Sequence, residues 1–212
     1  MGRFRIGDAL PSSDPAARFV TVVAAALNDL LFVNRLLDRD DGGPEELQYL
    51  LRTAISHLWE FSLTLREWQQ QESTRPLFDS LDEGLLTDLE IVVGIASTTD
   101  QVSKTIACLR NNTTWHYAKP GKDKVIEKAL DEARDLEGIL EFGATTGTIR
   151  ARFANVIILQ VSIQLFPGMP EAEAVKTLYS RFGELMVAAI RVAQQLLVAF
   201  FESLPTGAVT FR

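Results

Sequence analysis

Residues 12–37 read SSDPAARFVTVVAAALNDLLFVNRLL, and this stretch indicates how the chain begins to fold. The serine and aspartate side chains ahead of Pro15 are good N-cap acceptors, and proline is well tolerated in the first turn of a helix. Apolar residues then recur every three or four positions, at Phe19, Val23, Leu27, Leu30, Val33 and Leu37. The stretch therefore predicts an amphipathic helix of about 25 residues.

A second helix is predicted after the break at residues 40–44, which read DDGGP. Glu45 and Glu46 suit the positive N-terminal end of a helix, and a polar run at residues 69–73 marks its end. Between these limits apolar residues keep helical spacing, at Leu47, Leu51, Ile55, Leu58 and Leu65. The connection between the two helices is short, so we expect them to pack antiparallel.

The rest of the chain also has helical rather than strand periodicity. Further helices are predicted at residues 77–94, 100–110, 124–140, 149–166 and 171–204. Residues 143–148 form the one expected hinge. The β-branched residues at 157–163 are also compatible with a short strand in that segment. No β-α-β alternation and no internal repeat occurs. We therefore predict an all-α helical bundle, with two long antiparallel N-terminal helices and long C-terminal helices.

Composition excludes several kinds of site. Cys108 is the only cysteine, so the chain forms no internal disulfide and no multi-cysteine zinc site. With His57 and His116 as the only histidines, a three-histidine metal site is excluded as well, and we expect no metal and no cofactor. The net charge of -7 argues against a surface that coats nucleic acid throughout. Residues 104–128, however, carry a local net charge of +4.

The sequence predicts a cytoplasmic protein without a membrane span. Residues 1–10 contain no apolar run of signal-peptide length, and a single thiol fits a reducing compartment. The longest charge-free stretch, residues 153–170, includes Asn155, Gln160, Gln164 and two prolines. Such a composition is typical of a buried core helix instead of a membrane helix.

The densest polar cluster lies at residues 109–117, which read LRNNTTWHY. Along a regular helix Arg110 and His116 would lie about 240° apart around the axis, and so on different faces. Asparagine and threonine are poor helix formers, so we expect residues 111–114 to break or distort the helix. Such a break allows the two side chains to converge.

This segment resembles the signature of the HEPN superfamily of small helical domains. That signature is an arginine, often followed directly by a polar residue, and then a histidine after four to six residues. Here it is matched by Arg110, Asn111 and His116, with five residues between the arginine and the histidine. The resemblance covers residues 13–140, preceded by an N-terminal extension at 1–12 and followed by additional C-terminal helices at 141–212.

The resemblance implies a metal-independent endoribonuclease acting as a homodimer, with two motifs meeting across the interface. His116 would exchange protons with the ribose 2'-hydroxyl or the leaving oxygen. Arg110 would stabilise charge on the phosphate, and Asn111 would bind the phosphate or hold one tautomer of His116. The substrate would be RNA, because the nucleophile is the 2'-hydroxyl.

Several neighbouring residues are candidates for binding the substrate or supporting the site. Trp115 and Tyr117 could stack on bases or belong to the core, and Lys119, Lys122 and Lys124 could guide phosphate or form a solvated turn. His57 and Glu60 lie three positions apart on the predicted second helix. They could support His116 from the same cleft or form a plain surface pair.

Three interpretations of the motif remain open from sequence. The first is the toxin or effector of a toxin–antitoxin or anti-phage system, restrained by an antitoxin or other regulatory protein. The second is a non-catalytic HEPN-like module that binds a nucleotide, RNA or protein. In the third, Arg110 and His116 have structural roles only. In some toxins of this kind a tyrosine two positions after the histidine is modified, whereas Tyr117 follows His116 directly.

Overall fold

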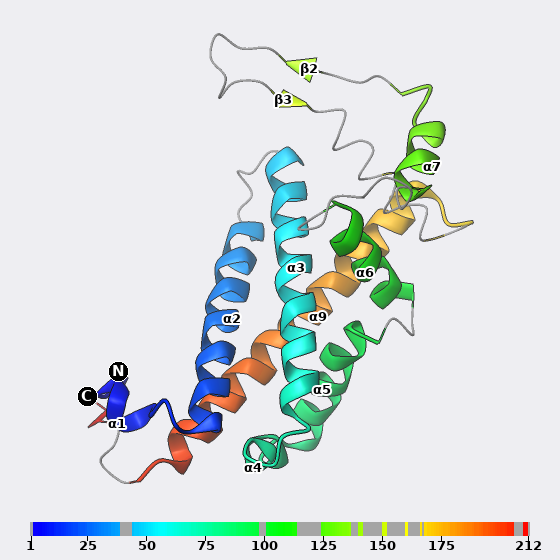
Figure 1. The fold of residues 1–212 in the computed structure, drawn as a ribbon. Coiled ribbons are helices and arrows are strands. Elements are labelled where there is room, and N and C mark those ends of the chain that lie inside the picture. The colour runs from blue at the N-terminus through cyan, green and yellow to red at the C-terminus, as the bar shows by residue number, and fades with distance from the viewer. Residues whose placement is uncertain are drawn as a thin grey trace.

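The computed structural model describes residues 2–38, 44–97, 101–113, 124–136, 140–141, 150–151, 160, 166, 168–205 and 210–211. Helices account for most of this part of the chain, and the only strands within it are two residues long (Figure 1). The predicted all-α fold is therefore confirmed. Expectations for residues 152–165 fall almost wholly outside the described residues, and so does the strand expected at 157–163.

The two long opening helices form as predicted. Helix α2 spans Pro15–Leu37 and helix α3 spans Pro44–Trp68. They pack side by side and run antiparallel (Figure 1). The cap at the start of α2 is Asp14, whose carboxylate accepts a hydrogen bond from the backbone N–H of Ala16 at 2.9 Å. This bond satisfies one of the donors that the first turn of a helix leaves unpaired.

Replacing Asp14 with alanine should lower the free energy of unfolding by about 1 kcal/mol, because the Ala16 N–H loses its acceptor. Urea denaturation followed by circular dichroism measures this loss. Asp38→Ala is the matched control, since Asp38 lies at the opposite, negative end of α2. Removing a carboxylate there should leave stability unchanged or raise it slightly. Equal losses in both variants would contradict the capping role of Asp14.

The expected third helix at residues 77–94 is wrong in its extent, because it consists of two helices. Helix α4 covers Arg75–Asp79 and helix α5 covers Glu83–Ile95. The division occurs at Asp82, which has an extended backbone and accepts a hydrogen bond from the Leu85 N–H at 2.9 Å. An aspartate that caps a new helix competes with continuation of the preceding one.

The middle of the chain departs further from the predicted pattern. Helix α6 spans Gln101–Thr113 and helix α7 spans Lys124–Glu132, so the helix expected at 124–140 ends early. Only some of the apolar residues in this segment are buried. Ala129 and Ala133 are buried, whereas Leu130 and Leu136 are about half exposed. The helix expected to start at 149 is also wrong there, because strand β3 (Arg150–Ala151) pairs antiparallel with strand β2 (Leu140–Glu141).

The long closing helix α9 spans Glu171–Ser203 and confirms the prediction for residues 171–204. The chain enters it through Gly168, whose φ of 81° favours glycine over residues with a side chain. Helix α9 packs against α2 and α5, so α2, α3, α5 and α9 together surround the core. Helix α6 is added outside this bundle, against α3 and α5.

The two ends of the chain lie together (Figure 1). Strand β1 (Gly2–Arg3) pairs antiparallel with strand β4 (Thr210–Phe211), and the short helix α1 (Ile6–Ala9) follows β1. The rings of Phe4 and Phe201 contact each other with centroids 5.1 Å apart. The first residues are thus attached to the end of α9 by both backbone and side-chain contacts.

Two helices among the described residues, α2 and α9, are long and apolar enough to cross a membrane by length and composition. Both also supply buried residues to the core of the bundle, including Leu30 from α2 and Leu196 from α9. Core helices of water-soluble proteins pass the same test. The two helices are therefore weak grounds for a membrane location.

Candidate functional site

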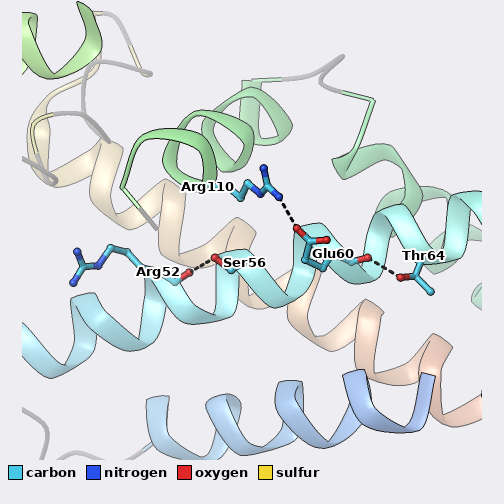
Figure 2. Close-up of polar contacts among 5 residues, drawn as sticks. All are labelled: Arg52, Ser56, Glu60, Thr64 and Arg110. Atoms are coloured by element: carbon cyan, nitrogen blue, oxygen red, sulfur yellow. Dashed lines mark hydrogen bonds and ion pairs between the residues drawn. The ribbon is translucent and has the colours of Figure 1, made fainter. Parts of the chain in front are cut away.

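Arg110 lies one turn before the end of α6 and faces α3 (Figure 2). Its guanidinium Nη2 is 2.7 Å from Oε1 of Glu60, close enough for a charge-assisted hydrogen bond. The arginine side chain is only 19% exposed, whereas the glutamate side chain is 56% exposed. Arg110 is therefore held beneath the surface by a carboxylate that remains in contact with solvent.

The contact depends on the way that α5 and α6 are attached to α3. Ser62 of α3 donates a hydrogen bond from its hydroxyl to the Val93 carbonyl (3.3 Å) and accepts one from the Ala96 N–H (3.0 Å). On α6, Ser103 donates to the carbonyl of Gly94 at 3.3 Å. These bonds fix the junction between α5 and α6 against α3. They therefore set the position along α3 at which Arg110 meets Glu60.

Apolar packing holds the rest of α6 in place. Ile106 and Leu109 are fully or almost fully buried, and Thr105 beside them is buried too. On α3, Ser56 is buried one turn before Glu60, with its hydroxyl donating to the Arg52 carbonyl at 3.2 Å (Figure 2). The polar pair thus lies at the edge of a packed interface between two helices.

The predicted helix break at residues 111–114 is wrong for residues 111–113, which continue α6. Three residues along a regular helix turn through about 300°, which leaves the first and the last about 60° apart around the axis. Thr113 therefore leaves α6 on nearly the same side as Arg110. The side-chain contacts of Asn111 lie outside the description.

Most of the other residues proposed from the motif also lie outside the described residues. These are Trp115, His116, Tyr117, Lys119 and Lys122. Lys124 is the first residue of α7, and its side chain is not described. The structure therefore places the arginine of the motif but not its histidine.

The two supporting residues predicted on α3 contact different helices. Nδ1 of His57 is 3.5 Å from a carboxylate oxygen of Asp29 on α2, whereas Glu60 contacts Arg110 on α6. Both pairs join residues far apart in the chain, so no local sequence signal identifies Asp29 as the partner of His57 or Glu60 as the partner of Arg110. Of the two predicted supporting residues, Glu60 contacts the arginine of the motif and His57 contacts Asp29.

Two further features of the described part of the chain concern metal ligands and surface depressions. No group of three or more His, Cys, Asp or Glu side chains gathers there as a set of metal ligands. A shallow depression of about 610 Å³ is lined by residues of α2, α5 and α9, among them Leu27, Leu85 and Val198. None of its lining residues belongs to α3 or α6, so it is separate from the Arg110–Glu60 pair.

No protein-family model, no curated protein and no solved structure matches this chain. A function for this chain is therefore inferred from its own residues and from the geometry around Arg110.

Proposed function

We propose that this chain is a HEPN-type, metal-independent endoribonuclease that cleaves RNA by attack of the ribose 2'-hydroxyl. The observation that carries the proposal is the anchoring of Arg110 by Glu60 at 2.7 Å. A guanidinium held by a carboxylate on a rigid helix is oriented before substrate arrives, which is what stabilisation of a transition-state charge requires. Glu60 in this view is a positioning residue.

The chain length after α6 is compatible with a site shared by Arg110 and His116. Thr113 is the last residue of α6, and His116 follows three residues later. Extended chain covers at most about 3.6 Å per residue, so the Cα atoms of Thr113 and His116 lie within about 11 Å of each other. The last turn of α6 adds about 5 Å between Arg110 and Thr113, so the limit for Arg110 and His116 is about 16 Å. One phosphate between an arginine and a histidine side chain fits within that limit. A single chain can therefore supply both groups.

His116 acts in this proposal as the acid–base group, and Arg110 stabilises the charge that develops on the phosphate. The products are a 2',3'-cyclic phosphate and a 5'-hydroxyl end. Asn111 binds the phosphate or orients His116. The +4 charge of residues 104–128, which includes Lys119, Lys122 and Lys124, attracts RNA to this end of an otherwise acidic chain. Trp115 and Tyr117 provide stacking surfaces for bases.

A cytoplasmic toxin or defence effector is the biological role that this activity suggests. An unrestrained ribonuclease damages the cell that makes it, so an antitoxin or other regulatory protein is the expected partner. A homodimer is expected as well.

The direct test is incubation of the purified protein with mixed cellular RNA in the presence of EDTA. Cleavage should persist unchanged, because the proposed chemistry uses an imidazole and a guanidinium and requires no magnesium. Gel electrophoresis measures the cleavage, and end-group analysis should show cyclic phosphates. His116→Ala is the control that separates this activity from a contaminating nuclease. Cleavage that stops in EDTA and returns with magnesium would refute the proposal.

A second candidate function is a non-catalytic helical module that binds a nucleotide, RNA or protein through the same face. The regular helix through Thr113 and the ion pair between Arg110 and Glu60 favour it, because a structural arginine has the same surroundings. Expression in a bacterial host distinguishes the two candidates. Toxicity that disappears in His116→Ala supports the enzyme, and harmless expression of both proteins supports the module.

A further inference from the structure

Helix α9 presents a continuous exposed stripe along its outer side. Residues spaced three or four positions apart are exposed over most of its length, including Ser180, Glu184, Val187, Arg191, Gln194 and Val198. This spacing keeps the residues on one face of the helix. The opposite face, with Phe182, Ala189 and Leu196, is buried against α2 and α5. Within the described part of the chain, helix α9 therefore has one face in the core and one that is exposed to solvent.

Two valines of this stripe are well exposed, and one of them has an exposed apolar neighbour. Val187 is 53% exposed and Val198 is 45% exposed. Asp88 of α5 contacts Arg191 at 3.1 Å, and α5 runs antiparallel to α9 (Figure 1). One turn further along α5 therefore brings Ile91, which is 47% exposed, beside Val187. Adjacent exposed apolar side chains of this kind are typical of interaction surfaces.

The charges around Val187 are arranged so that the stripe complements itself. Glu184 lies three residues before Val187 and contacts Arg181 at 2.8 Å within the chain. Arg191 lies four residues after Val187 and contacts Asp88. The side chains of Glu184 and Arg191 are both more than half exposed, so each can also contact a second copy. A two-fold axis perpendicular to α9 near Val187 brings a second α9 alongside in the opposite direction. Residues about 5 Å before the axis in one copy then lie opposite residues about 5 Å after the axis in the other copy. Glu184 of each copy faces Arg191 of the other, and the two Val187 side chains meet between these pairs.

We propose that two copies of this chain associate through α9, packed antiparallel about a two-fold axis at Val187. A two-fold contact uses the same patch on both copies, which is the commonest arrangement in soluble oligomers. The charges also specify the alignment. An axis shifted to the Arg191–Gln194 turn would bring the two Arg191 side chains together, and like charges at an interface are unfavourable. Binding of the stripe to another protein or to a membrane surface is an alternative outcome of the tests described below.

This association is independent of RNA cleavage. Arg110 lies on α6, which packs against α3 and α5, whereas the exposed stripe is on the outer side of α9. The two Arg110–Glu60 pairs would therefore not meet across the α9 interface. A dimer formed this way leaves each chain to act alone, in contrast to the composite site that the family resemblance implies.

The first test is sedimentation equilibrium of the full chain over a range of concentrations. Val187→Glu should raise the dimer dissociation constant on the order of 10²-fold, because it places two unpaired carboxylates together at the two-fold axis. Val22→Glu is the matched control, since Val22 of α2 is 44% exposed and lies off the stripe. It should leave the dissociation constant unchanged. Circular dichroism confirms that both variants are folded, as expected for exposed positions.

The second test exchanges the charges. Glu184→Lys combined with Arg181→Gln should weaken self-association, and so should Arg191→Glu combined with Asp88→Asn. The second change in each variant avoids a new repulsion with Arg181 or Asp88 within the chain. Mixing the two variants should restore a dimer, because every cross-interface pair in the heterodimer is then of opposite charge. Arg181→Gln alone and Asp88→Asn alone are the controls, and each should dimerise as the wild type does.

Several results would overturn the proposal. One is a wild-type monomer at every concentration. Equal dimerisation of the Val187→Glu and Val22→Glu variants would place the interface elsewhere, and mixed variants that stay monomeric would refute the paired charges. A monomer that cosediments with phosphatidylcholine–phosphatidylglycerol vesicles, and loses this binding in Val187→Glu, would assign the stripe to a membrane surface instead.

Discussion

Arg110→Ala and His116→Ala should each lower the rate of RNA cleavage on the order of 10²-fold or more. The first variant removes the group that stabilises charge on the phosphate, and the second removes the acid–base group. Single-turnover cleavage of a labelled RNA measures both rates. Arg66→Ala is the matched control, because Arg66 also bonds to the protein near a helix end, donating to the Ala96 carbonyl at 3.3 Å. It should cleave as the wild type does.

Two further variants test how Arg110 acts. The double alanine variant should lose less than the product of the two single losses, because groups that act together on one transition state cannot each be lost at full cost. Arg110→Lys should also fail, since an ammonium group does not reproduce the planar fork of the guanidinium. Additive losses, or an active lysine variant, would contradict a shared role at one phosphate.

The stability of these variants separates catalysis from folding. Arg110 is only 19% exposed, so Arg110→Ala also removes a packed aliphatic stem and should cost about 1–2 kcal/mol in the free energy of unfolding. Cleavage should therefore be compared well below the melting temperature of each variant. If the alanine variants unfold while Arg110→Lys stays active, the motif is structural and the ribonuclease assignment fails.

The second large effect concerns the core. Phe19→Ala should lower the free energy of unfolding by about 3–5 kcal/mol, because a large buried ring is replaced by a cavity. Phe19 is fully buried, and its ring lies 5.3 Å from that of Trp68 and 5.5 Å from that of Phe78. One residue thus joins α2 to α3 and α4. Urea denaturation measures the change.

Phe32→Ala provides the comparison on the same helix. Phe32 is 61% exposed, so its replacement should change the free energy of unfolding by less than about 0.5 kcal/mol. A small loss at Phe19, or a loss at Phe32 of similar size, would contradict the assignment of the buried face of α2. Helical spacing alone distinguishes these two residues, because Phe19 belongs to the apolar repeat and Phe32 does not.

The sequence alone determined the helices whose signals are local. The start of α2 follows from the Asp14–Pro15 cap, and its buried face follows from the apolar repeat. Helices α3 and α9 were predicted in the same way, close to their observed limits. In each case the same residue pattern predicts both the secondary structure and the face of the helix that is buried.

The apolar repeat did not by itself decide every segment. Residues 77–94 have one apolar repeat, but the Asp82 cap, itself a local signal, divides them into two helices. In two other segments only the tertiary structure decided the outcome. Residue 140 ends the helix predicted at 124–140, yet the backbone of residues 140–141 pairs with residues 150–151. Residues 111–113 are poor helix formers but remain helical in α6, where Ile106 and Leu109 are buried in the core. Propensity is a small free energy, and packing of one buried residue exceeds it.

The candidate site divides in the same manner. The motif from Arg110 to His116 is visible in sequence because its residues are close together in the chain. That Arg110 is held by Glu60, while the neighbouring His57 contacts Asp29, required the structure. Glu60 and Arg110 are 50 residues apart, and their contact exists only because α5 and α6 return along α3. A chemical motif can thus be local, whereas the partners that orient it are set by helix packing, a long-range property of the fold.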